Sequence, residues 1–496
     1  MMKFCSLSLL TFVGVFANIC ASSLHNVYQR SVNETETKET QDEFWKRGII
    51  LQIYPRSYYD YNGDGTGDIR GIIAKADYFV ELGVEMVWLT PILQSPMKDF
   101  GYDISDFKEI DPIFGSMEDY ENLLKELHDK GIKVIFDFVP NHTSDQHEWF
   151  QKKVVEEMDN VFRFWLDKGV DGFRVDALKH LVEVEDVYGA DEPVAEDSEI
   201  TDPTQYSYLN HTLTVNLPET FNITRGWYEI LDSYDDRLMM TEVYDDDIRE
   251  MMRYYGNESY PISDFTFNFL LITKLTNRSD VTGTNLKNLV DLWMDNMPSG
   301  RWPNWVLGNH DNKRVSSRFG VDLIDALNMF ILLLPGTPTT YYGEEIGMVD
   351  TYISYEDTQD PAGCNNGPEH YTETSRDPVR TPMQWDESQN AGFSTSENTW
   401  IPVNENYPGL NVQVENSVEQ SHLLVYKELA KLRLKKTFQF GELEFQTATD
   451  EVVAFVRSYE DSQTYLIVIN TSPEEVTIDV SERKRCTSRK RNCNPW

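Results

Sequence analysis

Eight short apolar runs, separated by longer segments with helical periodicity, are the feature that most constrains how this 496-residue chain can fold. The runs are rich in β-branched and aromatic residues, which favours buried strands, and the segments between them favour crossover helices. This alternating order predicts an α/β fold, a (β/α)8 TIM barrel. The expected strands lie at residues 49–54, 86–91, 134–138, 172–175, 238–242, 262–267, 305–308 and 339–342.

Amphipathic helices are expected between these strands, because apolar residues recur three and four positions apart at 117–130, 154–168 and 322–333. After a last helix near 418–432, strand-forming runs follow one another without a helical stretch, which predicts a small C-terminal antiparallel β domain. The expected divisions are a signal peptide at 1–21, an N-terminal segment at 22–43, the catalytic barrel at 44–436, the β domain at 437–480 and a basic tail at 481–496.

Polar residues close several of the expected strands, and a barrel of this kind places its active site at the carboxyl ends of its strands. One acid at a strand end could be a solvated loop residue, but polar residues on four converging strands indicate a site. These residues are Asp137, Asn141 and His142 at the third strand, Arg174 and Asp176 at the fourth, Glu242 at the fifth, and His310 and Asp311 at the seventh.

Arg174 and Asp176 are two positions apart on a strand, so their side chains point to the same face. The guanidinium can then hold the carboxylate ionised. An ionised Asp is suited to nucleophilic attack, while a second, less solvated carboxyl with a raised pKa is suited to protonating a leaving oxygen. Glycoside hydrolysis uses this division of labour, and an ion pair in the barrel core is the structural alternative.

The same residues lie in motifs that resemble the four signature regions of the α-amylase superfamily. These motifs are DFVPNH at 137–142, GFRVDALKH at 172–180, TE at 241–242 and GNHD at 308–311. Residues 101–103 (GYD) resemble a further sugar-contacting motif, and residues 380–386 (RTPMQWD) resemble a loop typical of α-glucosidases and oligo-1,6-glucosidases. The similarity runs from about residue 44 to residue 480 and is greatest to the insect maltases.

The resemblance implies a retaining α-glucosidase with Asp176 as nucleophile, Glu242 as acid and then base, and Asp311 as transition-state stabiliser. It also implies that the carboxyl groups of Asp176 and Glu242 lie roughly 5–5.5 Å apart. Ala177, where 1,6-preferring relatives tend to carry Val, is more typical of α-1,4 specificity. The residues expected to line the glucose subsite are Asp103, His142, Arg174 and His310.

A glycine-rich loop at residues 60–68 alternates oxygen-bearing side chains with glycines, which suits a hard cation. Because members of the resembled family often carry a structural Ca2+ here, the resemblance implies a structural calcium site. A glycine-rich turn with solvated acids is the alternative. The expected ligands are Asp60, Asn62, Asp64, Thr66 and Asp68.

Two departures from the resembled family affect the expected site. Relatives insert a small subdomain after the third strand that walls one side of the pocket, whereas here residues 143–151 lead directly to a helix near residue 152. A short crossover does not prevent folding, but a more open site excludes water less well and fixes the donors less firmly. The strand pattern also stops after residue 480, so the β domain is expected to be incomplete. A splice form or an imperfect gene model would explain both.

Residues 1–21 have the charged start, apolar run and small residues of a secretory signal, so the mature protein is expected to be secreted and extracellular. Processing would leave Cys364, Cys486 and Cys493, which permit at most one disulfide and one odd thiol, with the pairing open. Asn141 matches a glycosylation sequon, but its neighbours place it beside the active site. The other sequons, typical of a glycoprotein, are Asn33, Asn210, Asn222, Asn257, Asn277 and Asn470.

A formal net charge of −39 argues against a nucleic-acid partner, because phosphate contacts need clustered basic side chains. A neutral small oligosaccharide fits better. A membrane transporter subunit that shares this barrel would need a spanning helix before it, and no stretch is long enough. Two hypotheses remain: an active α-glucosidase releasing glucose from maltose- or sucrose-like sugars, or a catalytically impaired barrel isoform that acts as a binding or receptor protein. The oligomeric state stays open.

Overall fold

A parallel sheet of eight strands forms the centre of the molecule in the computed structural model, which describes residues 2–4, 43–144, 147, 155–184, 191–195, 200–203 and 205–478. The order of the strands, β11-β8-β7-β6-β3-β2-β13-β12, makes a nearly closed barrel. All eight expected strands and the TIM-barrel class are confirmed. The strands are β2 (Ile50–Ile53), β3 (Met86–Leu89), β6 (Lys133–Phe138), β7 (Gly172–Val175), β8 (Leu238–Thr241), β11 (Phe265–Thr266), β12 (Asn304–Val306) and β13 (Thr337–Tyr341).

The seam between β11 and β12 is joined by one side chain. Asn304 on β12 accepts a 2.8 Å hydrogen bond from the backbone N–H of Asn268 and donates a 2.6 Å bond to the carbonyl oxygen of Thr266. Strand β11 is shorter than the expected 262–267, because the Asp264 carboxylate accepts the backbone N–H of Met239 where a ladder bond would otherwise form. Buried amide and carboxylate groups thus satisfy backbone groups that the ladder leaves free.

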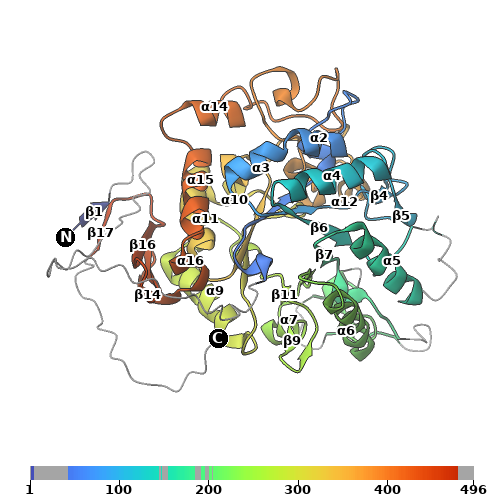
Figure 1. The fold of residues 1–496 in the computed structure, drawn as a ribbon, viewed down its shortest axis with the longest axis horizontal. Coiled ribbons are helices and arrows are strands. Elements are labelled where there is room, and N and C mark those ends of the chain that lie inside the picture. The colour runs from blue at the N-terminus through green and yellow to red at the C-terminus, as the bar shows by residue number, and fades with distance from the viewer. Residues whose placement is uncertain are drawn as a thin grey trace, which may run out of the picture.

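Helices surround the barrel, as the periodicity predicts (Figure 1). Helix α4 starts with a capping box in which Ser116 and Asp119 each bond the other's backbone N–H. The longer helices are α4 (Met117–Asp129), α5 (Val155–Lys168), α6 (Pro218–Asp232), α9 (Gly283–Asn296), α11 (Ile324–Leu333) and α15 (His422–Arg433). The shorter ones are α1 (Pro55–Tyr58), α2 (Ile69–Ala74), α3 (Ala76–Leu82), α7 (Ile248–Arg253), α8 (Leu270–Thr273), α10 (Val315–Phe319), α12 (Pro361–Asn366), α13 (Tyr371–Thr374), α14 (Val412–Ser417) and α16 (Lys436–Phe440).

The C-terminal antiparallel sheet is confirmed and lies beside α9 and α16 on one side of the barrel (Figure 1). Arg457 of this sheet is buried and donates hydrogen bonds to the carbonyl oxygens of Leu333, Phe438 and Gly441, which ties the sheet to the end of α11. Strands outside the barrel are β1 (Met2–Phe4) paired with β17 (Val476–Ile478), β4 (Leu93–Gln94) with β5 (Asp106–Ile110), β9 (Gly256–Asn257) with β10 (Tyr260–Pro261), and β14 (Glu442–Ala448), β15 (Val452–Ser458) and β16 (Tyr465–Asn470) in one sheet.

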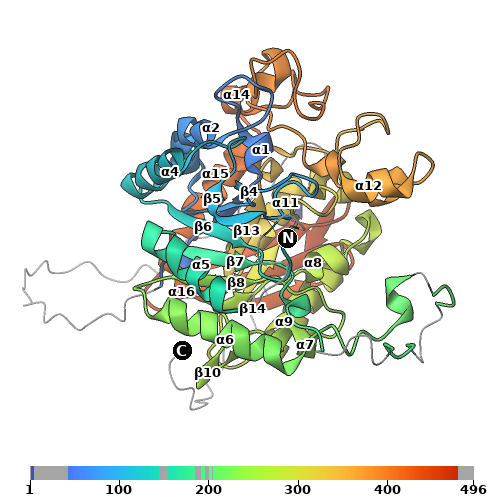
Figure 2. The same ribbon diagram turned by 90° about the vertical axis from the view of Figure 1, so that its right-hand side faces the viewer.

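The connection from β6 to α5 is short, as the sequence predicts: the strand ends at Phe138 and the helix begins at Val155. The sequence did not predict a second feature, a long segment between β13 and α15. The segment between β13 and α15 runs through α12, α13 and α14 and forms loops at one end of the barrel, drawn in orange in Figures 1 and 2. These loops reach the carboxyl ends of the strands, because Tyr342, just after β13, donates a hydrogen bond to the carbonyl oxygen of Thr381.

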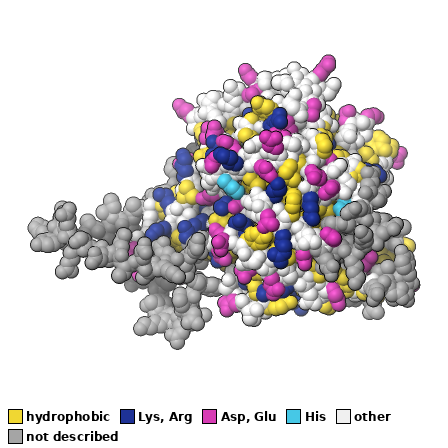
Figure 3. Space-filling view, turned by 45° about the vertical axis from the view of Figure 1, so that its right-hand side comes forward, with side chains coloured by type: hydrophobic (Ala, Val, Ile, Leu, Met, Phe, Trp, Pro, Cys, Tyr) yellow, Lys and Arg dark blue, Asp and Glu magenta, His cyan; other side chains and the backbone are white. Residues whose placement is uncertain are grey.

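The chain has a formal net charge of −39, yet acidic and basic side chains are interspersed on the face shown in Figure 3. No helix among the described residues is both long and apolar enough to cross a membrane.

Candidate active site

The carboxyl ends of β6, β7 and β8 bring three acids around one arginine. Nη1 of Arg174 lies 2.7 Å from Oδ1 of Asp137 and 2.6 Å from Oδ1 of Asp176, while its Nη2 lies 2.6 Å from Oε2 of Glu242. Arg174 is 1% exposed, and its guanidinium also lies over the ring of Trp88. The expected same-face arrangement of Arg174 and Asp176 is confirmed.

Asp176 is buried between opposing influences. Burial raises the pKa of this carboxyl, and the nearby Arg174 lowers it. The negative charges of Asp137 and Asp311 raise it again, so the net pKa lies above the ordinary range of an Asp. With its pKa raised to about 6, Asp176 is still mostly ionised at neutral pH, although burial outweighs the effect of the guanidinium.

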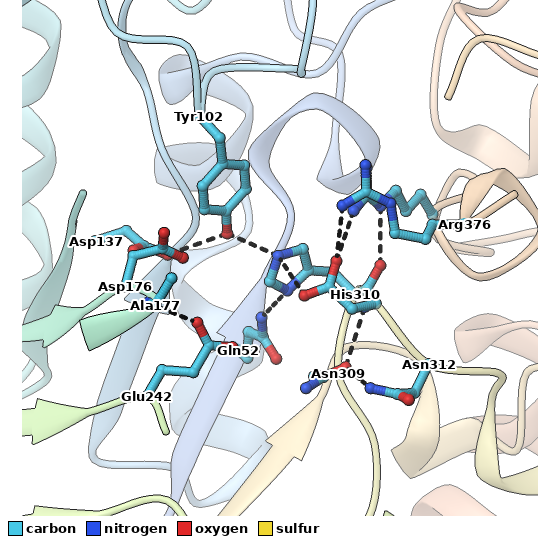
Figure 4. A network of polar contacts seen from close by, with 12 residues as sticks. Gln52, Tyr102, Asp137, Asp176, Ala177, Glu242, Asn309, His310, Asn312 and Arg376 are labelled. Atoms are coloured by element: carbon cyan, nitrogen blue, oxygen red, sulfur yellow. Dashed lines mark hydrogen bonds and ion pairs between the residues drawn. The ribbon is translucent and has the colours of Figure 1, made fainter. Parts of the chain in front are cut away.

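Glu242 has the environment of a proton donor. Burial raises its pKa to about 7, with Arg174 acting in the opposite direction. One carboxylate oxygen accepts a 3.0 Å hydrogen bond from the backbone N–H of Ala177 (Figure 4). A carboxyl with a pKa near neutrality can be protonated in part of the molecules and give that proton to a leaving oxygen.

Asp311 lies in the segment that follows β12 and stays ionised. Burial raises its pKa, but neighbouring groups outweigh burial and bring the net pKa below the ordinary range. Arg380 lies 2.8 Å and Arg376 3.2 Å from Oδ1 of Asp311. His310 is neutral at physiological pH, because burial lowers its pKa to about 3, so the two arginines supply the positive charge.

His310 is fixed by a chain of buried hydrogen bonds (Figure 4). Its Nδ1 lies 2.8 Å from the amide nitrogen of Gln52, and its Nε2 lies 2.7 Å from the hydroxyl of Tyr102. With the Gln52 amide donating to Nδ1, Nε2 carries the proton, and the Tyr102 hydroxyl is free to donate to Asp137 at 3.3 Å. The rings of Tyr102 and His310 are stacked, with centroids 5.5 Å apart.

Arg376 is a site residue that the sequence analysis did not identify. It lies between three acids, 2.6 Å from Asp360, 3.0 Å from Asp99 and 3.2 Å from Asp311. Its only sequence signal was its position four residues before the RTPMQWD motif that begins at Arg380. Gln52 was missed, and Tyr102 was noted only as part of the GYD motif, because their contacts to His310 bridge distant strands and loops.

Two residues expected in the glucose subsite make no described contact with the Arg174 cluster. Asp103 accepts hydrogen bonds from the hydroxyl of Ser95 and from the backbone N–H groups of Lys98 and Asp99, so it fixes the loop that carries Asp99. His142 is exposed, with Nδ1 3.0 Å from the side-chain oxygen of Asn141. Their contact with a sugar remains a prediction.

The expected calcium loop is held by its own backbone. Asp60 accepts the N–H groups of Gly63 and Gly65, and Asp68 accepts those of Tyr61 and Gly71. Within the described residues, no group of three or more His, Cys, Asp or Glu side chains is placed to hold a metal ion. These oxygens would have to exchange backbone partners for a cation, so calcium binding stays a prediction.

Comparisons with known proteins agree with this geometry. A family model described as "Alpha amylase, catalytic domain" matches residues 52–155 and 151–441. Maltase A1 of Drosophila melanogaster is 39% identical over 517 aligned positions, covering 89% of each chain. An alpha-glucosidase of Apis mellifera is 41% identical and covers 87% of this chain and 86% of its own. The solved structure of XgtA, an alpha-glucosyl transfer enzyme, superposes with a TM-score of 0.78 at 29% identity, over 87% of this chain and 92% of that one.

The family match divides at residues 151–155, where the short connection between β6 and α5 lies. The alignment with Maltase A1 has more positions than this whole chain has residues, so that relative carries residues that are missing here. Over the rest of the barrel the match is continuous and includes every strand end that carries a buried acid or arginine of the site. These findings show that the chain belongs to the α-amylase family.

Proposed function

We propose that this chain is a retaining α-glucosidase, a maltase, that hydrolyses terminal non-reducing α-1,4-linked glucose from maltose- or sucrose-like oligosaccharides. The observation that carries the proposal is the single buried guanidinium of Arg174, which contacts both Asp176 and Glu242. One arginine thereby places two carboxyls of different pKa beside each other, as acid–nucleophile chemistry needs. The matches to maltases and α-glucosidases give the substrate class.

In the first step, a carboxylate oxygen of Asp176 attacks the anomeric carbon, and the bond from that carbon to the leaving oxygen breaks. The proton of Glu242 goes to the leaving oxygen. Asp311, held ionised by Arg376 and Arg380, stabilises the positive charge that develops on the sugar ring.

In the second step, the Glu242 carboxylate takes a proton from water, the water oxygen bonds to the anomeric carbon, and the ester to Asp176 breaks. Because each step inverts the anomeric centre, the released glucose retains its configuration.

The test is glucose release from maltose and from 4-nitrophenyl α-glucoside by the secreted chain, beside an Asp176→Asn variant. An Asp295→Asn variant is the matched control, because Asp295 is exposed on α9, away from the strand ends. Activity that persists in the control and vanishes in Asp176→Asn supports the proposal. A folded wild type without activity would favour the receptor hypothesis, which the short β6–α5 connection and the expected incompleteness of the β domain motivate.

Secretion, N-glycosylation and structural Ca2+ binding at residues 60–68 belong to the same proposal. The signal-like residues 1–21 support secretion, and the sequons at Asn210, Asn222, Asn257 and Asn277 are exposed, which supports glycosylation. Asn470 is half-buried, and Asn33 lies outside the described residues. Cys364 is exposed and free, while Cys486 and Cys493 lie outside the described residues.

A further inference from the structure

A cavity of about 440 Å³ lies in the loops between β13 and α15, apart from the catalytic carboxyls. Its walls come from residues 357, 359, 389, 390, 397–403, 405 and 407. This volume is within the usual range of small-molecule sites, which runs from about 300 to about 1,000 Å³. None of its lining residues belongs to the Arg174 cluster or contacts Asp311 directly in the described hydrogen bonds.

The lining combines aromatic rings with many oxygen acceptors. Trp400 and Tyr407 are half-buried in the wall, and the carboxylates of Asp357, Glu397 and Glu405 are exposed beside them. Three carboxylates repel an anion, and a purely apolar ligand would displace their bound water without replacing its hydrogen bonds. A neutral molecule with hydroxyl groups and an apolar face suits this wall, because hydroxyls can donate to carboxylates while a ring face packs on an aromatic side chain.

Amide side chains in the wall are held in fixed positions. The amide nitrogen of Asn390 donates to the carbonyl oxygen of Ser396 at 2.8 Å, and that of Gln389 donates to the same oxygen at 3.1 Å. Gln359 donates to the carbonyl oxygen of Asp357 at 3.3 Å. These bonds use the amide nitrogens, so the amide oxygens are the acceptors that a hydroxyl ligand can use. Anchoring of this kind reduces the entropy lost on binding.

An exposed aromatic ring lies on a loop that is hydrogen-bonded to the 397–407 segment. Asn404 donates a 3.3 Å hydrogen bond to the carbonyl oxygen of Asp350, which brings the 397–407 wall alongside residues 350–352. Tyr352 there is 79% exposed, the highest exposure among the large apolar side chains of the described residues. An exposed ring on a loop joined to this wall offers a surface on which a second sugar unit could pack.

The cavity is connected to the active site through two sets of contacts. Trp400 packs against Tyr54, whose ring in turn stacks on His310. On the other wall, the backbone N–H groups of Gln359 and Asp360 both bond Asp377, and Asp360 holds Arg376 against Asp311. A ligand in the cavity would therefore contact the loop that positions Arg376 without reaching the nucleophile.

We propose that this cavity is an accessory carbohydrate site that binds one or two glucose units of an α-linked oligosaccharide. The recognition of a neutral sugar follows from the walls themselves, and the choice of glucose units rests on the proposed function. The site would hold a second oligosaccharide near the catalytic centre and raise its local concentration.

The experiment titrates maltotriose into the full chain carrying Asp176→Asn, which cannot turn the sugar over, and measures binding stoichiometry by calorimetry. We expect two sites. Adding Gln359→Ala and Asn398→Ala, both at exposed wall positions, should remove one of them. The matched control adds Asn296→Ala and Gln446→Ala, exposed amides on α9 and β14, and should keep both.

Stoichiometry that the wall substitutions leave unchanged would overturn the accessory site, and so would equal losses in the wall and control variants. Assays of maltose hydrolysis by the wild type separate the two proposals. If the wild type hydrolyses maltose but the chain shows only one binding site, and the wall substitutions leave that site intact, the α-glucosidase is supported and the accessory site is rejected. If the wild type does not hydrolyse maltose but the wall substitutions abolish a binding site, the accessory site is supported and the α-glucosidase is rejected.

Discussion

The backbone N–H of Ala177 donates a 3.0 Å hydrogen bond to Oε2 of Glu242, so the residue after the nucleophile holds the proposed proton donor. Ala177 makes this bond in the left-handed region, with φ and ψ both 40°. A residue with a Cβ in this conformation costs roughly 1–2 kcal/mol. The strained backbone therefore supports a contact on which the orientation of Glu242 depends.

Ala177→Val should lower kcat/KM for maltose more than for isomaltose and should lower the melting temperature. A β-branched side chain is strongly disfavoured at positive φ, and its added methyl groups would crowd the Glu242 carboxyl. Ala177→Gly is the control, because glycine adopts this conformation without strain and keeps the N–H donor. An unchanged ratio of maltose to isomaltose hydrolysis in Ala177→Val would show that this position does not set linkage preference.

Arg174→Lys should reduce kcat/KM for maltose by at least about a hundredfold, because an ammonium group cannot reproduce the planar contacts to Asp137, Asp176 and Glu242. Leaving buried carboxylates without their partner typically costs about 3–5 kcal/mol, which urea unfolding would measure. Arg249→Lys is the control, since Arg249 forms an exposed ion pair with Asp247. Near-normal activity in Arg174→Lys would contradict a bridging role for the guanidinium.

The activity should fall as pH rises through about 7, because Glu242 must be protonated to donate and burial raises its pKa to about 7. The activity should also fall at low pH, because Asp176 must be ionised to attack. Burial raises the pKa of Asp176, so this fall should begin at a higher pH than for an ordinary Asp. The measurement is kcat/KM against pH with 4-nitrophenyl α-glucoside. With α-glucosyl fluoride, whose leaving group needs no proton, Glu242→Gln should keep measurable activity and lose the basic limb. A basic limb that persists in this variant would point to another group.

Removal of calcium should lower the melting temperature, and adding Ca2+ back should restore it. Asp60 and Asp68 are both buried, and the charge of Asp60 contributes to the raised pKa of Asp68, after the larger effect of burial. A bound cation would offset this repulsion. The measurement is thermal unfolding with and without a chelator, beside Asp64→Ala, which should lose the response. Identical melting curves would mean that the loop is a turn held by backbone N–H groups alone.

Expression in insect cells should release the chain into the medium with residues 1–21 removed and with glycans on exposed sequons. Endoglycosidase treatment should reduce the mass, and Asn222→Gln and Asn257→Gln should each remove one increment, because both side chains are exposed. Mass spectrometry of the secreted protein checks both points. Asn141→Gln is the control and should leave the mass of the glycans unchanged. Retention of the chain inside the cells would contradict the secretory prediction.

Much of the barrel could be predicted because its strands are buried on both faces and therefore read as apolar runs. The predicted strand bounds were wrong where a side chain takes the place of a backbone ladder hydrogen bond, as the Asp264 carboxylate does at the N–H of Met239. Asp176, Glu242 and Asp311 were found through short motifs at strand ends. Arg376 could not be found in this way, because its three acidic partners come from segments that only tertiary folding brings together.

The loops between β13 and α15 were unpredictable for a different reason. Their polar side chains bond local backbone groups, as Asn390 does with Ser396, and short turns of this kind have no period to detect. The raised pKa of Asp176 was also not predicted, because a sequence shows which charges can be neighbours but not how deeply they are buried.

Residues 139–154 are all that joins β6 to α5, and His142 within them is exposed. A sugar in this site would therefore have few contacts from the β6–α5 connection itself. Contacts that hold substrate and transition state equally lower KM without raising kcat. Their loss should therefore weaken affinity more than turnover, which suits this chain to concentrated sugar solutions, where even a loosely held substrate saturates the enzyme.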